Sequence, residues 1–561
     1  MTAPAEPPVS ASPVPEDRHV APVASDGPPA PASPVPEDRH VAPVASDSPP
    51  APASPVPKAS PAARAPGGPW ARLRGESALL LPLALALFCT YAYFIGPPAW
   101  NQNSRLALTR ALVERGSTII DPDHATTGDK SFRAGHFYSD KAPGASLLAV
   151  PAYALYYAAT RVTGGELPAV RVVPLDPAAE LAGQQPDPEA RQPGDRLVYN
   201  QGHRTALYLT RLLSTSLLAI AGLAALYLLA RRQLAQGPAA LLTLLYGLAS
   251  PAFVYSTALY GHQPCADLLL LALAGTVLSQ KTARGGLFTG LCLGLAVACE
   301  YPAAVPAALL TGFALLHRGP RFAGFVVLGG LPGAALLAVY HLAAFGHPLK
   351  TGYDFVYLAE FAEGMRVNYG IHAPDPAVLQ ELLFGRFRGL FYLAPVLLLA
   401  AWGLLVQALA PDPKDMSEST WPTRQLAGLA LLVIGFYLAL NSGYYMWDGG
   451  AALGPRHCVP MLPFLALGLV PALRLVPGAV RILGAVSAAQ MLAAAAAAPE
   501  APQFGDPLWG HAWPLLFAGQ PGYGGATNLG RLLGLPGVFS LLPLLALWWW
   551  TWQQVKPQLG R

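Results

Sequence analysis

Apolar stretches long enough to cross a bilayer recur along the chain from about residue 78 to its end. A helix needs roughly 20 mostly apolar residues to cross the hydrocarbon core. The pattern therefore predicts an all-α polytopic membrane protein with about twelve transmembrane helices. The predicted spans are 78–98, 206–230, 237–257, 265–280, 286–300, 302–316, 322–345, 388–409, 425–441, 459–473, 481–498 and 536–553.

One further apolar segment, 144–163, does not fit this alternation. It contains one proline and three tyrosines, and aromatic rings concentrate where a membrane meets water. A crossing here would place the basic pair Arg231 and Arg232 on the outer side. We therefore interpret 144–163 as an interfacial helix of the first outer loop. If it crosses instead, the chain has thirteen spans.

Basic loops orient the spans, because Lys and Arg accumulate on the cytoplasmic side of a membrane protein. Arg72 and Arg74 precede the first span, which predicts a cytoplasmic N-terminus, and the later short basic loops fall on the same side. We expect a multi-pass protein of the bacterial inner membrane whose active face points away from the cytoplasm. The long polar segments share that outer side: 99–143 with 164–205, 346–387, 442–458 and 499–535.

The first 75 residues differ from the rest of the chain. They contain a 21-residue tandem repeat, ASPVPEDRHVAPVASDGPPAP from Ala11 and a near-identical copy from Ala32. A segment so rich in Pro and Ala, with few large apolar residues, cannot bury a core, so we expect 1–75 to be a disordered cytoplasmic tail. A membrane domain, 76–555, and a short cytoplasmic C-terminus, 556–561, complete the predicted organisation.

Composition narrows the function classes. Hydrophobic residues make up 53% of the chain and charged residues 12%, which excludes a string of soluble domains. The net charge of +4 is spread over short loops and gives no basic stripe for nucleic acid. The five cysteines show neither metal-ligand spacing nor the pattern of a disulfide framework.

The first outer loop carries the strongest candidate chemistry. Asp121, Asp123, Asp129 and Asp140 lie within 20 residues, and Lys141 follows directly. A carboxylate can take the proton of an incoming hydroxyl while a fixed cation neutralises a departing phosphate. The pair Asp140-Lys141 stands directly before the apolar segment 144–163, where desolvation of the charges demands partners. We interpret Asp129 as an ordinary solvated loop residue.

Several motifs carry a resemblance to a known superfamily. The segment Tyr138-Ser-Asp-Lys-Ala-Pro143 resembles the Tyr-x-(Asp/Glu)-Lys-Pro-Pro segment of GT-C glycosyltransferases, which use polyprenyl-phosphate sugars and include protein O-mannosyltransferases and the aminoarabinose transferases of bacterial lipid A. Further similar segments are Tyr255-Ser-Thr-Ala-Leu-Tyr-Gly-His262 with Asp267, Arg388-Gly-Leu-Phe-Tyr-Leu-Ala-Pro395, and Trp447-Asp-Gly-Gly with Gly454-Pro-Arg-His457. The similarity runs from about residue 78 to 475.

The resemblance implies a GT-C-like fold that transfers a sugar from a polyprenyl phosphate to an acceptor at the outer face. Lys141 would lie near the donor phosphate. One departure bears on the catalytic base, because Asn101-Gln102-Asn103 stands where those enzymes usually carry an Asp-Glu pair. Amides cannot act as bases, so we expect Asp121 or Asp123 to take the role, with Asp140 as a further catalytic candidate.

Cations at the outer ends of spans are candidates for holding the donor phosphate, since guanidinium groups suit phosphate geometry. They are Arg386, Arg388, Arg456 and His457; their alternative role is to extend from the span ends to the membrane interface. His262, Asp267 and Glu300 are candidates for contacting the acceptor or another part of the substrate. Asp267 matches a second acidic position of the superfamily.

The expected partners are a polyprenyl-phosphate sugar donor, a glycan, lipid or protein acceptor, and membrane lipids, with no nucleic acid. The sequence establishes no cofactor and leaves a divalent metal open. Two other function classes fit the same scaffold. One is a non-catalytic transporter or flippase of lipid-linked glycans, which the missing Asp-Glu pair favours. The other is a structural membrane subunit whose Pro-rich tail recruits cytoplasmic partners.

Overall fold

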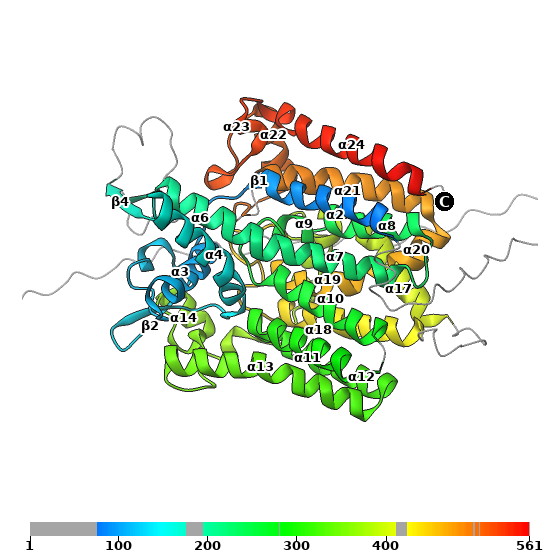
Figure 1. Ribbon diagram of the computed structural model, residues 1–561, viewed down its shortest axis with the longest axis horizontal. Helices are drawn as coiled ribbons and strands as arrows, with labels where there is room; N and C mark the ends of the chain where they lie inside the picture. Colours follow the sequence, from blue (N-terminus) through cyan, green and yellow to red (C-terminus); the bar gives the residue numbers. More distant parts are fainter. Residues whose placement is uncertain are drawn as a thin grey trace, which may run out of the picture. The chain divides into compact units, whose positions relative to one another are not determined.

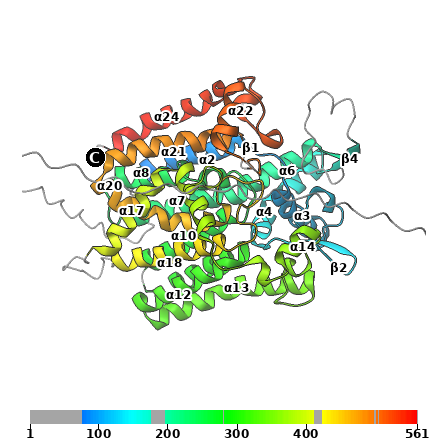
Figure 2. The same ribbon diagram turned by 180° about the vertical axis from the view of Figure 1, so that it is seen from behind.

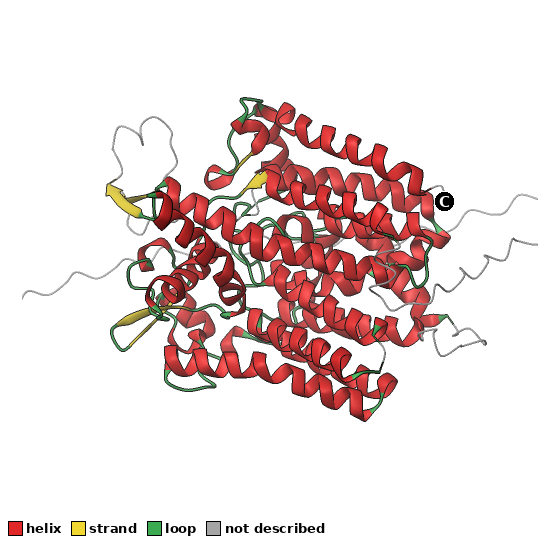
Figure 3. Ribbon diagram, in the orientation of Figure 1, coloured by secondary structure: helices red, strands yellow, loops and turns green. Residues whose placement is uncertain are grey.

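A computed structural model describes residues 76–174, 195–279, 281–410, 423–497, 500–503 and 505–559. The predicted disordered tail, 1–75, lies outside the described residues, as do the last two residues of the predicted C-terminal segment. The described part of the chain is mostly helical, as the apolar pattern predicts (Figures 1 and 3).

Each predicted span contains helix, although several boundaries differ from the prediction. The helices in these segments are α2 (Ser77–Tyr93), α6 and α7 (Gln201–Arg211 and Leu217–Ala230), α8 (Gln236–Leu248), α10 (His262–Leu278), α11 (Ala283–Cys299), α12 (Ala304–Arg318), α13 (Pro320–Phe345), α17 (Val396–Leu409), α18 (Thr423–Ser442), α19 and α20 (Leu462–Ala466 and Leu469–Leu475), α21 (Pro477–Ala497) and α24 (Leu542–Leu559).

Among the described residues, four helical stretches are long and apolar enough to cross a membrane, or up to five if a bent pair forms one span. The bent pair joins Arg456–Ala466 to Leu469–Leu475 at an angle of 51°. Shorter apolar helices such as α2, α10, α11 and α17 accompany them. The chain is therefore a multi-pass membrane protein. The unbroken stretches are Gln201–Ala230, Pro320–Phe345, Arg424–Ser442 and Pro477–Ala497.

Prolines account for two corrections to the predicted spans. The predicted span 388–409 is broken after α16 (Leu390–Leu393), and α17 begins directly after Pro395. The predicted span 237–257 likewise ends its long helix at Leu248, and the short α9 (Ala252–Tyr255) begins after Pro251. Proline lacks the backbone N–H that continues a helix and suits the start of the next one.

The polar segments gather at one end of the helical bundle. Figures 1 and 2 show α3, α14 and α22 at that end, together with β2 and β4. The short antiparallel strand pairs were not predicted; they join β1 (Phe94–Ile95) to β6 (Thr527–Asn528), β2 (Lys130–Arg133) to β3 (His136–Ser139), and β4 (Val170–Pro174) to β5 (Asp195–Tyr199). The short helices of these segments are α3 (Trp100–Arg115), α14 (Ala359–Met365), α15 (Pro376–Phe384), α22 (Trp513–Ala518) and α23 (Leu529–Leu532).

The segment 144–163 forms a helix, α4 (Gly144–Thr163), as predicted. It packs against α3 and α6 at the polar end of the bundle. Its first residue also meets the end of α11, where a Cβ added to Gly144 would lie 2.4 Å from the backbone carbon of Ala298. By length and composition α4 is not among the described helices that qualify as spans.

The helices α11 and α13 approach each other through glycines. A Cβ added to Gly290 would lie 1.9 Å from the Val326 carbonyl oxygen, and one added to Gly329 would lie 2.2 Å from the Leu287 carbonyl oxygen. Small residues let helix backbones come close inside a membrane, where close packing drives helix association. This contact positions α11 beside α13, and Glu300 follows Cys299 directly at the end of α11.

We predict that Gly290→Ala destabilises the protein by about 1–3 kcal/mol, because the new methyl group forces α11 away from α13. The matched control is Gly324→Ala on α13, since a Cβ there meets nothing within 4 Å. Thermal unfolding of both variants in detergent measures the difference. Equal unfolding temperatures for the two would show that the glycine contact does not hold these helices together.

Candidate functional site

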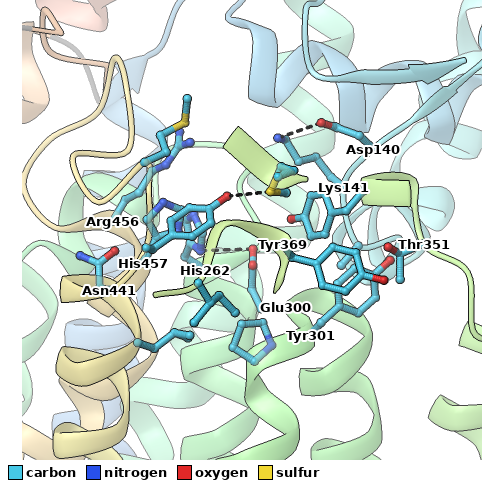
Figure 4. A pocket seen from close by; sticks show the side chains of 18 of the residues that line it. Asp140, Lys141, His262, Glu300, Tyr301, Thr351, Tyr369, Asn441, Arg456 and His457 are labelled. Atoms are coloured by element: carbon cyan, nitrogen blue, oxygen red, sulfur yellow. Dashed lines mark hydrogen bonds and ion pairs between the residues drawn. The ribbon is translucent and has the colours of Figure 1, made fainter. Parts of the chain in front are cut away.

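A cavity of about 580 Å³ lies at the end of the helical bundle where the polar segments gather. Its volume is that of a typical small-molecule site. Asp129, Asp140 and Lys141 come from the first outer loop, His262 from the start of α10, and Glu300 from the end of α11. The segment 349–371, the end of α18 and the segment 444–460 complete the wall (Figure 4).

Lys141 is held between two carboxylates. Its Nζ lies 3.3 Å from Asp129 Oδ1 and 3.3 Å from Asp140 Oδ2. The β2–β3 hairpin brings these residues together, because Asp129 precedes β2 and Asp140 follows β3. The other oxygen of Asp140, Oδ1, is buried and has no hydrogen-bond partner in the described part of the chain. A buried carboxylate oxygen without a partner is costly and marks a place for a ligand donor.

Burial raises the pKa of Asp140 to about 6; the Lys141 ammonium opposes this rise and the Asp129 carboxylate adds to it. For Lys141, burial lowers the pKa, but the two neighbouring carboxylates outweigh it and leave the pKa above its ordinary value. Lys141 is therefore a fixed cation near neutral pH. Asp140 gains and loses its proton in a pH range that suits a general base.

Arg456 and His457 lie on the other side of the cavity from Asp140 and Lys141 (Figure 4). Both stand at the start of the 3₁₀ segment η6 (Arg456–Met461), after a turn in which Gly454 has a φ of 63°. Among the described residues Arg456 forms no ion pair, and Arg456 Nε and His457 Nε2 are buried without hydrogen-bond partners. These nitrogens provide donors for an anionic ligand.

Glu300 forms a third charged group in the same wall. Its Oε1 lies 3.3 Å from Arg105 Nη2 and 3.2 Å from His262 Nδ1. Arg105 also donates to the side-chain oxygen of Asn101, one helical turn earlier in α3. Asn101 also lines the cavity, but its side-chain oxygen already accepts a hydrogen bond from the Arg105 guanidinium.

The remaining walls are aromatic and apolar. Tyr301, Tyr353, Tyr369, Tyr444 and Tyr445 line the cavity, and Tyr301 and Tyr353 meet edge to face with centroids 6.0 Å apart. Toward the helices the lining becomes apolar, with Phe436 and Leu440 from α18 and Pro460 from η6. The cavity thus suits an amphiphilic ligand with an anionic head and an apolar remainder.

The structure brings together Asp140, Lys141, His262, Glu300, Arg456 and His457 of the predicted site residues. The interpretation of Asp129 as a solvated loop residue is wrong, because its side chain is only 13% exposed and binds Lys141. The hairpin around it also buries the neighbouring Lys130, whose ammonium lies 4.8 Å from the ring centroids of Phe137 and Tyr357.

The two expected catalytic residues of the first loop lie outside this cavity. Asp121 accepts from the Phe137 amide at 2.7 Å and lies 2.7 Å from His136 Nδ1. Although burial alone would raise it, these partners lower the pKa of Asp121 and make it a weaker base. Asp123 is buried against Arg110 and lies 3.9 Å from Arg115. Both carboxylates have local partners that hold the loop.

Three other candidates also lie away from the cavity lining. Asp267 is buried within α10, one turn after Gln263, whose Nε2 donates to Asp267 Oδ1 at 2.9 Å. Arg388 is fully buried and donates to the backbone carbonyls of Gly450 and Ala452, so it supports the segment that leads to Arg456. Arg386 is exposed.

Sequence reasoning missed Arg105 and the tyrosines of segment 349–371. Arg105 had a local signal, because it follows Asn101 by four residues, which is about one helical turn, directly after the Asn101-Gln102-Asn103 segment. Tyr353 and Tyr369 had none, since only the tertiary fold brings that segment over the cavity. In the described part of the chain, no cluster of three or more His, Cys, Asp or Glu side chains is arranged to hold a metal ion.

No protein-family model and no curated protein sequence matches the chain. Among solved structures it is similar to ArnT from Cupriavidus metallidurans bound to undecaprenyl phosphate, with 15% identity and a TM-score of 0.43 over 75% of this chain and 64% of that one. It is also similar to the oligosaccharyltransferase of Archaeoglobus fulgidus in the apo form, with 12% identity and a TM-score of 0.39 over 75% of this chain and 52% of that one.

The archaeal oligosaccharyltransferase AglB from the same organism, in complex with an inhibitory peptide and a dolichol-phosphate, gives 11% identity and a TM-score of 0.38 over 74% of this chain and 52% of that one. The chain thus spans less than two thirds of the length of these structures.

We predict that Arg388→Ala destabilises the protein by at least about 2 kcal/mol, because two backbone carbonyls lose a charged donor. Arg456→Ala should change stability by less than about 1 kcal/mol, since its described contact is a cation–π interaction with Tyr260. Thermal unfolding of the two purified variants tests the contrast. A larger loss for Arg456→Ala would contradict a supporting role for Arg388 and a ligand-binding role for Arg456.

Proposed function

We propose that the protein is a GT-C-type glycosyltransferase that moves a sugar from a polyprenyl-phosphate donor to a glycan, lipid or protein acceptor at the outer face of the membrane. The observation that supports this most strongly is the charged cavity. A lysine bracketed by two carboxylates faces an arginine and a histidine with unpartnered nitrogens, and apolar walls continue from these groups toward the helices.

In this proposal Lys141 and Arg456 hold the donor phosphate, with His457 as a further donor. Ammonium and guanidinium groups suit this task because they form short, charge-assisted bonds to phosphate oxygens. The prenyl chain would follow the apolar lining formed by Phe436, Leu440 and Pro460. Arg388 and Arg386 then act outside the phosphate site.

Asp140 is the general base of the proposed reaction. The free oxygen of Asp140 takes the proton of the acceptor hydroxyl. At the same time the hydroxyl oxygen of the acceptor bonds to the anomeric carbon of the sugar. The bond from the anomeric carbon to the phosphate oxygen breaks, and its electron pair leaves with the phosphate, which Lys141 and Arg456 stabilise. One displacement of this kind inverts the anomeric configuration. Glu300, held by Arg105 and His262, is placed to bind sugar hydroxyl groups.

The proposed topology has twelve crossings of the bacterial inner membrane by the domain 76–555, with the tail 1–75 and the segment 556–561 in the cytoplasm. Its support comes from the short basic loops. The grouping of the polar segments at one end of the bundle agrees with a single active face.

The experiment that tests this function compares Asp140→Asn with Asp121→Asn. Replacing a general base by an amide removes the proton acceptor, so Asp140→Asn should lower sugar transfer by roughly 10²-fold or more while undecaprenyl-phosphate binding persists. Asp121→Asn, outside the cavity, should keep full transfer. Binding and transfer are measured on the same purified variants.

Loss of transfer in Asp121→Asn but not in Asp140→Asn would assign the base to the other carboxylate. A wild-type protein that binds the lipid and transfers no sugar from any polyprenyl-phosphate donor would instead support the non-catalytic transporter.

The pH dependence follows from the raised pKa of Asp140, about 6. A base works in its ionised form, so transfer should rise about tenfold per pH unit below this pKa and level off above it. The Asp129 carboxylate contributes to the rise in pKa, so Asp129→Asn should move the midpoint of the profile to lower pH. Rate measurements across pH 4–8 on both proteins check this prediction, and an unchanged midpoint in the variant would contradict the coupling.

A further inference from the structure

A second cavity, of about 470 Å³, lies within the outer segment 352–370. It is lined by residues of the 3₁₀ turn η4 (Gly352–Phe355), of α14 and of the turn η5 (Asn368–Gly370), together with Arg366, and it is partly open to the surface. Four residues line both cavities: Tyr353, Val356, Met365 and Tyr369. The two spaces are therefore neighbours that share one wall.

The turn that carries Tyr353 of this shared wall also lies against the backbone of Asp140, the proposed base. A Cβ added to Gly352 would lie 2.4 Å from the Cα of Asp140, so η4 begins in contact with that residue. Ser131 of β2 fixes the same turn by donating to the Gly352 carbonyl at 2.7 Å. Tyr353 follows immediately and is shared by both cavities. A group that enters from the second cavity past Tyr353 meets the Asp140 side of the first.

The other end of the shared wall is strained. Asn368 and Tyr369 have φ angles of 48° and 55°, and a bulky residue such as tyrosine rarely adopts this left-handed conformation. The Tyr369 hydroxyl donates to Asp354 Oδ1 at 3.2 Å, and the Gly370 carbonyl accepts from the Tyr445 amide at 2.8 Å. Strain that neighbouring contacts maintain is typical of ligand sites. These contacts hold Tyr369 at the boundary between the two cavities.

The charged residues that line the second cavity are Asp354 and Arg366. Both oxygens of Asp354 are occupied, by Lys350 and Tyr369 on one and by Thr351 on the other. Arg366 is exposed, and in the described part of the chain its guanidinium forms one ion pair, with Glu363 at 4.0 Å. A cavity with a weakly paired guanidinium and an engaged carboxylate favours a ligand that carries negative charge.

We propose that the second cavity binds the acceptor of the transfer reaction, and that this acceptor carries an anionic group held by Arg366 beside the hydroxyl that receives the sugar. This inference rests on the proposed function. The hydroxyl passes Tyr353 to reach Asp140, which takes its proton, while the donor remains in the first cavity on Lys141 and Arg456.

The test separates donor binding from acceptor use. Ala362 lines only the second cavity, so Ala362→Trp fills that space, and Arg366→Glu reverses the charge at an exposed position. Both variants should bind undecaprenyl phosphate with an affinity within about twofold of the wild type, because neither residue lines the first cavity. Their sugar-transfer rates should fall at least roughly tenfold. Glu360→Ala on the same helix is exposed, lines neither cavity and should match the wild type.

Undecaprenyl-phosphate binding is measured on purified protein, and transfer is measured in membranes supplied with radiolabelled undecaprenyl-phosphate hexoses and pentoses. Full transfer by either Ala362→Trp or Arg366→Glu would overturn the acceptor site. Loss of lipid binding in Arg366→Glu would do so as well, because it would assign this arginine to the donor. A wild-type protein that neither binds the lipid nor transfers sugar would instead overturn the proposed function itself, and the acceptor site with it.

Discussion

The site depends on the cost of removing charges from water at the edge of a membrane. Lys141 can be buried in this wall because Asp129 and Asp140 each place an oxygen 3.3 Å from its ammonium. Burying a charge without such partners would cost several kcal/mol of desolvation free energy. Within the described part of the chain, the pairing still leaves one oxygen of Asp140 without a hydrogen-bond partner. Across the cavity, one nitrogen each of Arg456 and His457 also has none there. An anionic ligand would complete this set, which is why the cavity supports a phosphate-binding function.

The surrounding helices and turns hold these charged groups in place around the cavity. The Asp129 and Asp140 carboxylates come from the two sides of one hairpin, Glu300 from the end of a helix packed through glycines, and Arg456 from a turn that Arg388 supports. The segment 349–371 supplies the wall shared by the two cavities, and its Gly352 lies against the backbone of Asp140, the proposed base. In the proposed reaction donor and acceptor enter from different spaces. A single displacement needs the incoming oxygen and the departing phosphate in line on opposite sides of the anomeric carbon.

Much of the fold could be predicted from the sequence, because apolar runs of membrane-spanning length each contain helix. The breaks could not be predicted, since proline alone does not mark them. Pro82 and Pro332 lie inside continuous helices, whereas α17 begins only after Pro395. The difference depends on whether surrounding helices satisfy the freed backbone groups, and a single sequence does not contain that information.

The site was predictable only in part. Asp140 and Lys141 could be found because a charged pair beside an apolar helix needs partners. The choice among Asp121, Asp123 and Asp129 could not be made, because each carboxylate's direction depends on the hairpin register and on a distant residue such as Arg110. Four aspartates in one polar loop look alike until the fold assigns their partners.

In the proposed function Lys141 and Arg456 together hold a lipid phosphate beside Asp140. An experimental structure of the protein with undecaprenyl phosphate would show where this phosphate binds. We expect phosphate density within hydrogen-bond distance, roughly 2.7–3.2 Å, of both Lys141 Nζ and the Arg456 guanidinium, with the prenyl chain along Phe436 and Leu440. Phosphate bound instead among Asp121, His136 and Arg110, or on Arg386 at the surface, would contradict it.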